Sequence, residues 1–322
     1  MRSLDYMNRV EAYVNRLNSE RRTVLETITQ VRFLDLMADE INCADMTADC
    51  EEDENKKYGV APNLDAVHTR GYAKRSLVLE DCSSWPVFYV HRYVGRFRIT
   101  MGFLLFAVTI TEEMKGRIIG FSLDTGADDI WNTDNPQIMV YVNGVLTCAM
   151  DLNHHEVILS DCAEPGKIYD IRLYAYVNSP GKSNFLYLKV FAKEQEAEAL
   201  YYDMKLPLEA AKQMRPEEEK RRKLLELLNQ AGDLLDLRVK KSDKYRASLI
   251  AASEWLKENL YEKEWELNGP TVYALGHTHI DVAWKWPLRQ TREKAVRSFS
   301  TVLYLMKRYP KYRFFFEPAA AL

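Results

Sequence analysis

The sequence has no run approaching the roughly 18 consecutive apolar residues that a membrane-spanning helix requires. Residues 1–40 mix arginine with acidic side chains in every turn, which is not the pattern of a signal peptide. The sequence also has no large excess of charge of one sign, because 44 Lys and Arg residues nearly balance 47 Asp and Glu residues, for a net charge of −3. We therefore expect neither a membrane nor a nucleic acid among the partners.

Cysteine is scarce, and the sequence contains no CxxC pair. The five cysteines are Cys43, Cys50, Cys82, Cys148 and Cys162. An odd number at such wide spacing favours reduced thiols in a cytoplasmic protein over a disulfide scaffold or a thiolate zinc site. The 322 residues are 47% hydrophobic, enough for a globular protein of two or three domains.

The N-terminal region has a helical pattern followed by an acidic stretch. Apolar residues recur at intervals of three and four through residues 4–37, which predicts one or two amphipathic helices. Residues 42–63 are rich in Asp and Glu and read as a solvated loop. We assign residues 1–80 to an N-terminal helical region and loop.

Between about residues 85 and 192 the hydrophobic period changes to two, the period of strands with one buried face. Asn143-Gly144 between two apolar runs predicts a hairpin with a type I′ turn. The expected strands are residues 98–111, 117–123, 137–142, 145–150, 156–159, 167–177 and 184–192. Short strands separated by turn residues favour an antiparallel β-sandwich of jelly-roll type over residues 81–199.

The C-terminal part begins with helices and ends in a β-α-β pattern. Residues 200–267 read as a helical connector. In residues 268–318, a short buried strand at 271–276 precedes a helix over 288–308 and a second strand at 312–316. We expect the first β-α-β unit of a truncated α/β barrel, with residues 319–322 a remnant of cloning. The fold class is therefore multidomain α+β.

The densest set of metal-binding side chains is GHTHIDVAWKWP, residues 276–287. It lies where the first strand of the β-α-β unit ends, the place where α/β enzymes put their sites. Residues His277, His279 and Asp281 share one side if the backbone stays extended. Imidazole nitrogen and carboxylate oxygen without thiolate suit Zn²⁺ or a similar divalent ion. Two tryptophans follow within the same segment.

This segment resembles the opening of the catalytic domain of glycoside hydrolase family 38 α-mannosidases. The resemblance continues through Arg292, FST at 299–301, LM at 305–306 and YPKYRF at 309–314. NPQIMVYVNG at 135–144, DLNH at 151–154 and EALYYD at 198–203 are similar to the N-terminal region of the family's cytosolic branch. The resemblance to the family covers roughly residues 130–318, is strongest from residue 271 onward and is weak before Asp81.

The resemblance implies a zinc-dependent retaining glycosidase that removes terminal α-linked mannose from oligosaccharides. It makes His279 and Asp281 metal ligands for Zn²⁺ or another divalent ion such as Co²⁺, Trp284 the residue that stacks on mannose, and His277 a support for the ligands. The catalytic nucleophile, the acid/base residue and two further ligands are expected beyond the C-terminus. The 322-residue chain should therefore be inactive, with its metal site weakly held or empty.

Two other interpretations remain open at this stage. An amidohydrolase-type barrel would use both His277 and His279 as ligands. A carbohydrate-binding or oligomerisation sandwich would be non-catalytic. We expect His154 and His155 to belong to an Asn-His turn that stabilises the sandwich, and the exposed β-α-β edges to make the chain a homo-oligomer.

Overall fold

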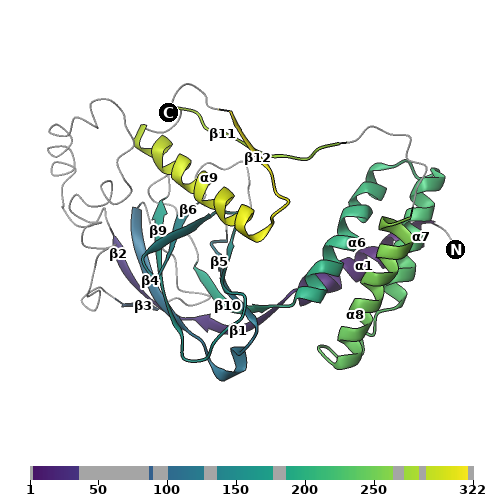
Figure 1. Ribbon diagram of the computed structural model, residues 1–322, viewed down its shortest axis with the longest axis horizontal. Coiled ribbons are helices and arrows are strands. Elements are labelled where there is room, and N and C mark those ends of the chain that lie inside the picture. Colours follow the sequence, from purple (N-terminus) through teal and green to yellow (C-terminus); the bar gives the residue numbers. More distant parts are fainter. Residues whose placement is uncertain are drawn as a thin grey trace. The chain divides into compact units, whose positions relative to one another are not determined.

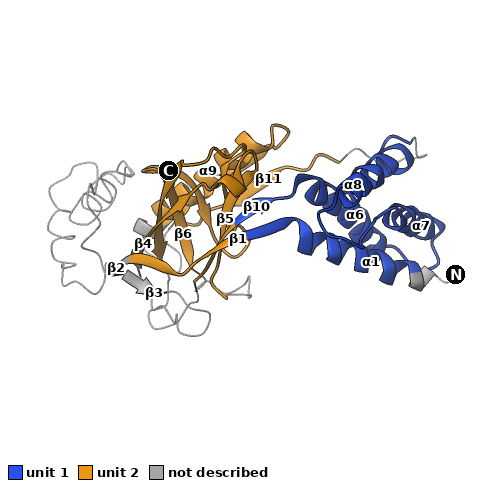
Figure 2. Ribbon diagram, turned by 90° about the horizontal axis from the view of Figure 1, so that it is seen from below, with its two compact units in different colours: residues 1–24, 191–271 blue, residues 25–190, 272–322 orange. Residues whose placement is uncertain are grey.

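The computed structural model describes residues 3–35, 87–89, 101–126, 136–176, 186–263, 272–282 and 288–317. The chain divides into two compact units (Figure 2): residues 1–24 with 191–271, and residues 25–190 with 272–322. None of the described helices combines the length and apolar character needed to cross a membrane. The predicted domain boundaries at residues 80, 199 and 267 stay predictions.

The first unit is a bundle of helices. Its helices are α1 (Ser3–Glu20), α6 (Gln195–Gln213), α7 (Glu219–Asp233) and α8 (Asp243–Leu256), and a π-helical turn, η2 (Lys257–Tyr261), extends α8. The helices predicted for the connector are therefore present. The hydroxyl of Ser242 caps α8 by accepting a hydrogen bond from the Tyr245 amide at 3.1 Å.

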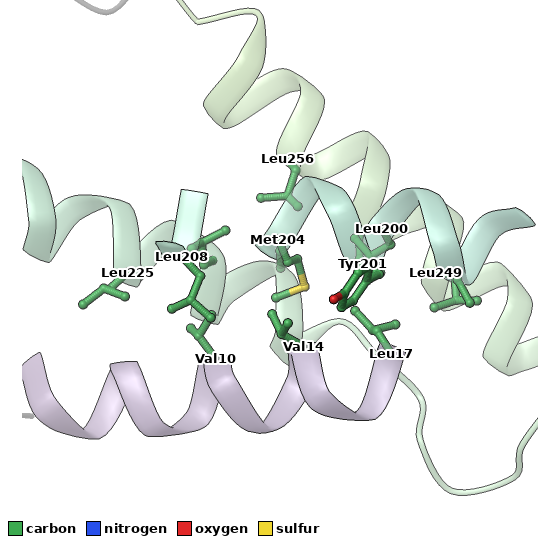
Figure 3. Packing of buried hydrophobic residues seen from close by; sticks show 14 of the residues in the cluster. Val10, Val14, Leu17, Leu200, Tyr201, Met204, Leu208, Leu225, Leu249 and Leu256 are labelled. Atoms are coloured by element: carbon green, nitrogen blue, oxygen red, sulfur yellow. The ribbon is translucent and has the colours of Figure 1, made fainter. Parts of the chain in front are cut away.

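One apolar core joins α1 to the three later helices. Val10, Val14 and Leu17 are spaced on one face of α1 and are almost fully buried. Figure 3 shows them facing Met204 and Leu208 of α6. The periodicity of residues 4–20 thus predicted the helix and its buried face, but not the distant helices against which that face packs.

The helical expectation is wrong for residues 22–35, and residues 36 and 37 lie outside the described residues. After α1 the chain forms β1 (Arg22–Ile28) and β2 (Gln30–Asp35). β2 pairs antiparallel with β3 (Val87–Tyr89) and with β4 (Met101–Thr109). Apolar spacing at three and four residues cannot distinguish a helix from strands whose partners lie far along the chain, so the pairing decided the structure.

Two sheets form most of the second unit. The six-stranded sheet has the order β3-β2-β4-β9-β6-β7, and the four-stranded sheet has the order β1-β10-β5-β8. The remaining strands are β5 (Ile118–Asp124), β6 (Gln137–Val142), β7 (Val145–Met150), β8 (Glu156–Ser160), β9 (Ile168–Tyr176) and β10 (Tyr187–Lys193). A short 3-10 helix, η1 (Glu112–Met114), precedes β5. The strands predicted for residues 98–192 are confirmed within these bounds.

The predicted hairpin is also confirmed. Asn143 and Gly144 have φ angles of 51° and 78°, the positive values of a type I′ turn, and they join the antiparallel strands β6 and β7. The two sheets meet where the rings of Phe106 and Phe121 pack edge to face at 5.4 Å. The jelly-roll topology stays a prediction.

The C-terminal part forms the expected β-α-β unit. β11 (Gly276–His279) pairs in parallel with β12 (Phe314–Glu317), and α9 (Leu288–Arg308) connects them. The first strand was predicted at residues 271–276 and as buried, which is wrong, since Val272 and Tyr273 are 83% and 84% exposed. The register with β12, which places Gly276 opposite Phe314, decides which residues form the strand. Closure into a barrel stays a prediction.

Candidate metal and ligand site

The two predicted metal ligands lie together at the carboxyl end of β11. His279 is the last residue of the strand, and Asp281 follows two positions later. The Nε2 atom of His279 lies 3.1 Å from Oδ1 of Asp281. Both side chains are about half exposed, at 51% and 45%, so they are open to a ligand.

The third member of the pattern has a different environment. The ring of His277 stacks on that of Phe315, with centroids 5.9 Å apart and planes inclined by 19°. The pairing of β11 with β12 places these residues opposite each other. The role of His277 as a support for the ligands stays a prediction, as does the role of Trp284, which lies outside the described residues.

The ligand pair opens onto a cavity of about 340 Å³ within the second unit. This volume is in the range of small-molecule sites. Its wall combines the end of β11, the side of α9 and the strands β6 and β7. The charged and titratable groups that matter here are Asp151, His154, His279, Asp281, Lys294 and Arg297.

The α9 wall of the cavity carries two cations. Burial is the main cause that lowers the pKa of Lys294, with the positive charge of Arg297 adding to the effect and Asp281 opposing it. Burial also lowers the pKa of Arg297. The guanidinium of Arg297 donates to the side-chain oxygen of Gln137, and its Nη1 lies 3.8 Å from a carboxylate oxygen of Glu293.

The opposite wall contains an acid and a histidine in one turn. Oδ1 of Asp151 accepts hydrogen bonds from the amides of Asn153 and His154, at 2.7 Å and 2.9 Å. Nδ1 of His154 lies 3.4 Å from the same oxygen. Burial would raise the pKa of Asp151, but these bonds outweigh it and the pKa is lowered, while the Asp151 partner raises the pKa of His154.

His154 was expected in a turn, and the structure places it in one with Asp151, while the stabilisation of the sandwich by this turn stays a prediction. Its place in the same cavity as the β11 ligand pair was not predicted. The sequence carries only a turn pattern there, and nothing local relates it to a strand so much later in the chain. Lys294 and Arg297 were missed for a similar reason, because two basic residues in an amphipathic helix usually face solvent.

The donor set fits part of a zinc site. Two ligands of a tetrahedral Zn²⁺ with bonds of about 2.0–2.1 Å stand roughly 3.3 Å apart, close to the 3.1 Å between His279 Nε2 and Asp281 Oδ1. Within the part of the chain that the structure describes, no group of three or more His, Cys, Asp or Glu side chains could hold a metal ion. A complete tetrahedral site therefore needs ligands in addition to these two.

Comparison with known proteins finds a family model that matches this segment. Residues 269–322 match the model of the glycosyl hydrolases family 38 N-terminal domain. This part of the chain is therefore similar to glycoside hydrolase family 38. The match covers His279, Asp281 and all of α9, and it gives no support to the amidohydrolase interpretation.

Similarity to curated family members extends further along the chain. The chain is 30% identical over 145 residues to an α-mannosidase of Saccharomyces cerevisiae, which covers 43% of this chain and 13% of the yeast protein. It is 29% identical over 119 residues to mouse α-mannosidase 2C1, which covers 37% of this chain and 11% of the mouse protein. The chain thus spans only about an eighth of the length of these relatives.

Among solved structures, a β-glucuronidase from Ruminococcus gnavus is similar over 54% of this chain and 30% of its own. The sequence identity is 13% and the TM-score is 0.28. At this score the similarity carries no argument about fold or function.

Proposed function

We propose that this chain is part of an α-mannosidase that hydrolyses terminal α-linked mannose from oligosaccharides by a zinc-dependent retaining mechanism. The proposal is supported above all by the 3.1 Å contact between His279 Nε2 and Asp281 Oδ1, within the segment that matches family 38. The oligosaccharide is then the partner of the site. No basic surface or membrane segment enters the proposal.

In this proposal His279 and Asp281 are the ligands that the chain contributes. To bind the ion, His279 must offer an unprotonated Nε2 and Asp281 must be ionised. When bound, Zn²⁺ or Co²⁺ would act as a Lewis acid that binds hydroxyl groups of the sugar. Trp284 stacks on the mannose ring, and His277 supports the ligands.

The covalent chemistry requires two carboxyl groups, one as nucleophile and one as acid/base. No residue of this chain is assigned to either role, and the chain corresponds to only 13% of its yeast relative. We therefore propose that the 322 residues alone hold zinc weakly and do not cleave mannosides. Turnover of an α-mannoside by the purified chain would refute this part of the proposal.

The metal-binding part is tested by titrating the purified chain with Zn²⁺ in a calorimeter. His279→Ala and Asp281→Asn should each weaken binding by at least about 10-fold, because each removes one of two ligands. The matched control is His155→Ala, which removes another half-exposed histidine whose ring lies next to Glu156. Equal affinity in all four proteins would overturn the assignment of the ligands.

The activity is tested on the full-length gene product, whose α-mannoside cleavage should disappear with a chelator and return with Zn²⁺ or Co²⁺. We also propose that this protein acts in the cytoplasm, on the basis of its reduced-cysteine pattern. Fractionation that finds the native protein elsewhere would refute that location.

A further inference from the structure

One face of α9 is polar and turned toward the two sheets. Glu293, Arg297, Thr301, Tyr304 and Arg308 follow one another at intervals of three or four residues, which places them on one side of the helix. All five make contacts with residues of the sheets or their connections. Figure 1 shows α9, in yellow, beside the strands labelled β6 and β9.

Two of these contacts are hydrogen bonds from backbone amides in the edge strands of the two sheets. β7 is the last strand of the six-stranded sheet, and β8 is the last strand of the four-stranded sheet. The amide of Ala149 in β7 donates to the Thr301 hydroxyl at 3.2 Å, and that of Ile158 in β8 donates to the Tyr304 hydroxyl at 2.9 Å. Edge amides need a partner when they are covered, so these hydroxyls tie one helix to both sheets.

Two buried charges hold the first half of the same helix. Glu293 and Arg297 are only 4% and 7% exposed. Glu293 accepts a hydrogen bond of 3.3 Å from the Tyr174 hydroxyl in β9, and Arg297 donates to Gln137 in β6. A buried charge costs several kcal/mol if its partner is lost, so these contacts favour one position of α9 on the sheet.

Helix α9 also contacts the proposed metal ligand Asp281. Thr291, in the first turn of α9 and 1% exposed, donates from its hydroxyl to the backbone carbonyl oxygen of Asp281 at 3.3 Å. Thr301 and Tyr304 thus join α9 to the edge strands β7 and β8, and Thr291 joins the same helix to Asp281, the residue that faces His279.

We propose that Thr301 and Tyr304 are positioning residues, which dock α9 on the edges of the two sheets and thereby hold Asp281 beside His279. The sheets would then be a structural part of the metal site, in addition to forming a wall of its cavity. This inference rests on the proposed function only where metal is concerned. The docking itself can be measured without metal.

The test compares the wild-type chain with Thr301→Val, Tyr304→Phe and the double variant. Thr301→Val keeps the shape but loses the acceptor, and Tyr304→Phe loses only the hydroxyl. Thr301→Ser restores an acceptor and is the conservative rescue. Leu303→Gln is the control on the other side of α9, since Leu303 is 66% exposed.

The first measurement is amide hydrogen exchange without metal. The double variant should exchange faster than the wild type at Ala149 and Ile158, and also across residues 276–282. The second measurement is the Zn²⁺ affinity of folded protein, which should fall about 3- to 10-fold in the double variant and recover with Thr301→Ser in place of Thr301→Val.

Faster exchange confined to Ala149 and Ile158, with residues 276–282 and the zinc affinity unchanged, would overturn the inference, because the hydroxyls would then be local anchors. The same change in Leu303→Gln would also overturn it. If the wild-type chain binds no zinc, the metal assignment fails, whereas exchange across residues 276–282 still decides whether α9 docking positions Asp281.

Discussion

Helices α7 and α1 of the first unit approach each other closely at Gly232, near the end of α7. A methyl group added there would stand 2.1 Å from Cδ2 of the Tyr13 ring in α1. This is about 1.3 Å short of the 3.4 Å at which ordinary contact begins. The ring cannot move freely, because the Tyr13 hydroxyl donates to Asp233 at 2.8 Å.

Gly232→Ala should therefore destabilise the protein, although alanine is the better helix former. Overpacking of this kind costs about 1–3 kcal/mol, and replacing glycine in a helix recovers about 0.5–1 kcal/mol. We expect a net loss of about 1–2 kcal/mol in the free energy of unfolding, measured by urea denaturation followed through the helical far-UV circular dichroism.

The control is the same substitution in two other backgrounds. In Tyr13→Ala the ring is gone, so Gly232→Ala should become stabilising by about 0.5–1 kcal/mol. In Tyr13→Phe the ring remains without its hydroxyl, so most of the destabilisation should remain. If Gly232→Ala has the same effect with and without the Tyr13 ring, the steric reasoning is refuted.

Three further predictions concern the second unit. The raised pKa of His154 and the lowered pKa of Asp151 mean that their pair stabilises the fold between the ordinary values of 3.8 and 6.5. Stability should decline as the pH rises through the pKa of His154, or falls through that of Asp151, and His154→Gln should remove the first decline in pH-dependent melting temperatures. Burial raises the pKa of the Cys148 thiol to about 12, so a thiol reagent should label exposed Cys162 in the native chain, with Cys148 reacting only in denaturant; labelling of native Cys148 would contradict this. The chain should self-associate through the β11–β12 pair, where Phe315 is 55% exposed, and Phe315→Ser should lower the mass seen by light scattering; a wild-type monomer at high concentration would exclude it.

The sequence by itself determined the features that depend on neighbours in the chain. Asn143-Gly144 specified its hairpin because those two residues tolerate positive φ angles. The apolar repeat of residues 288–308 predicted α9 with the bounds that the structure has. The spacing of His279 and Asp281 placed both donors on one side of an extended backbone, where they are 3.1 Å apart.

Only the tertiary structure decided the features that depend on distant partners. β1 and β2 follow a helical-looking pattern, yet they are strands because other strands pair with them. The turn of Asp151 and His154 lines the same cavity as Asp281 because α9 closes the edges of both sheets. Hydrogen bonds between remote segments leave no periodic signal in a sequence, so neither the cavity nor the docking of α9 could be derived from it.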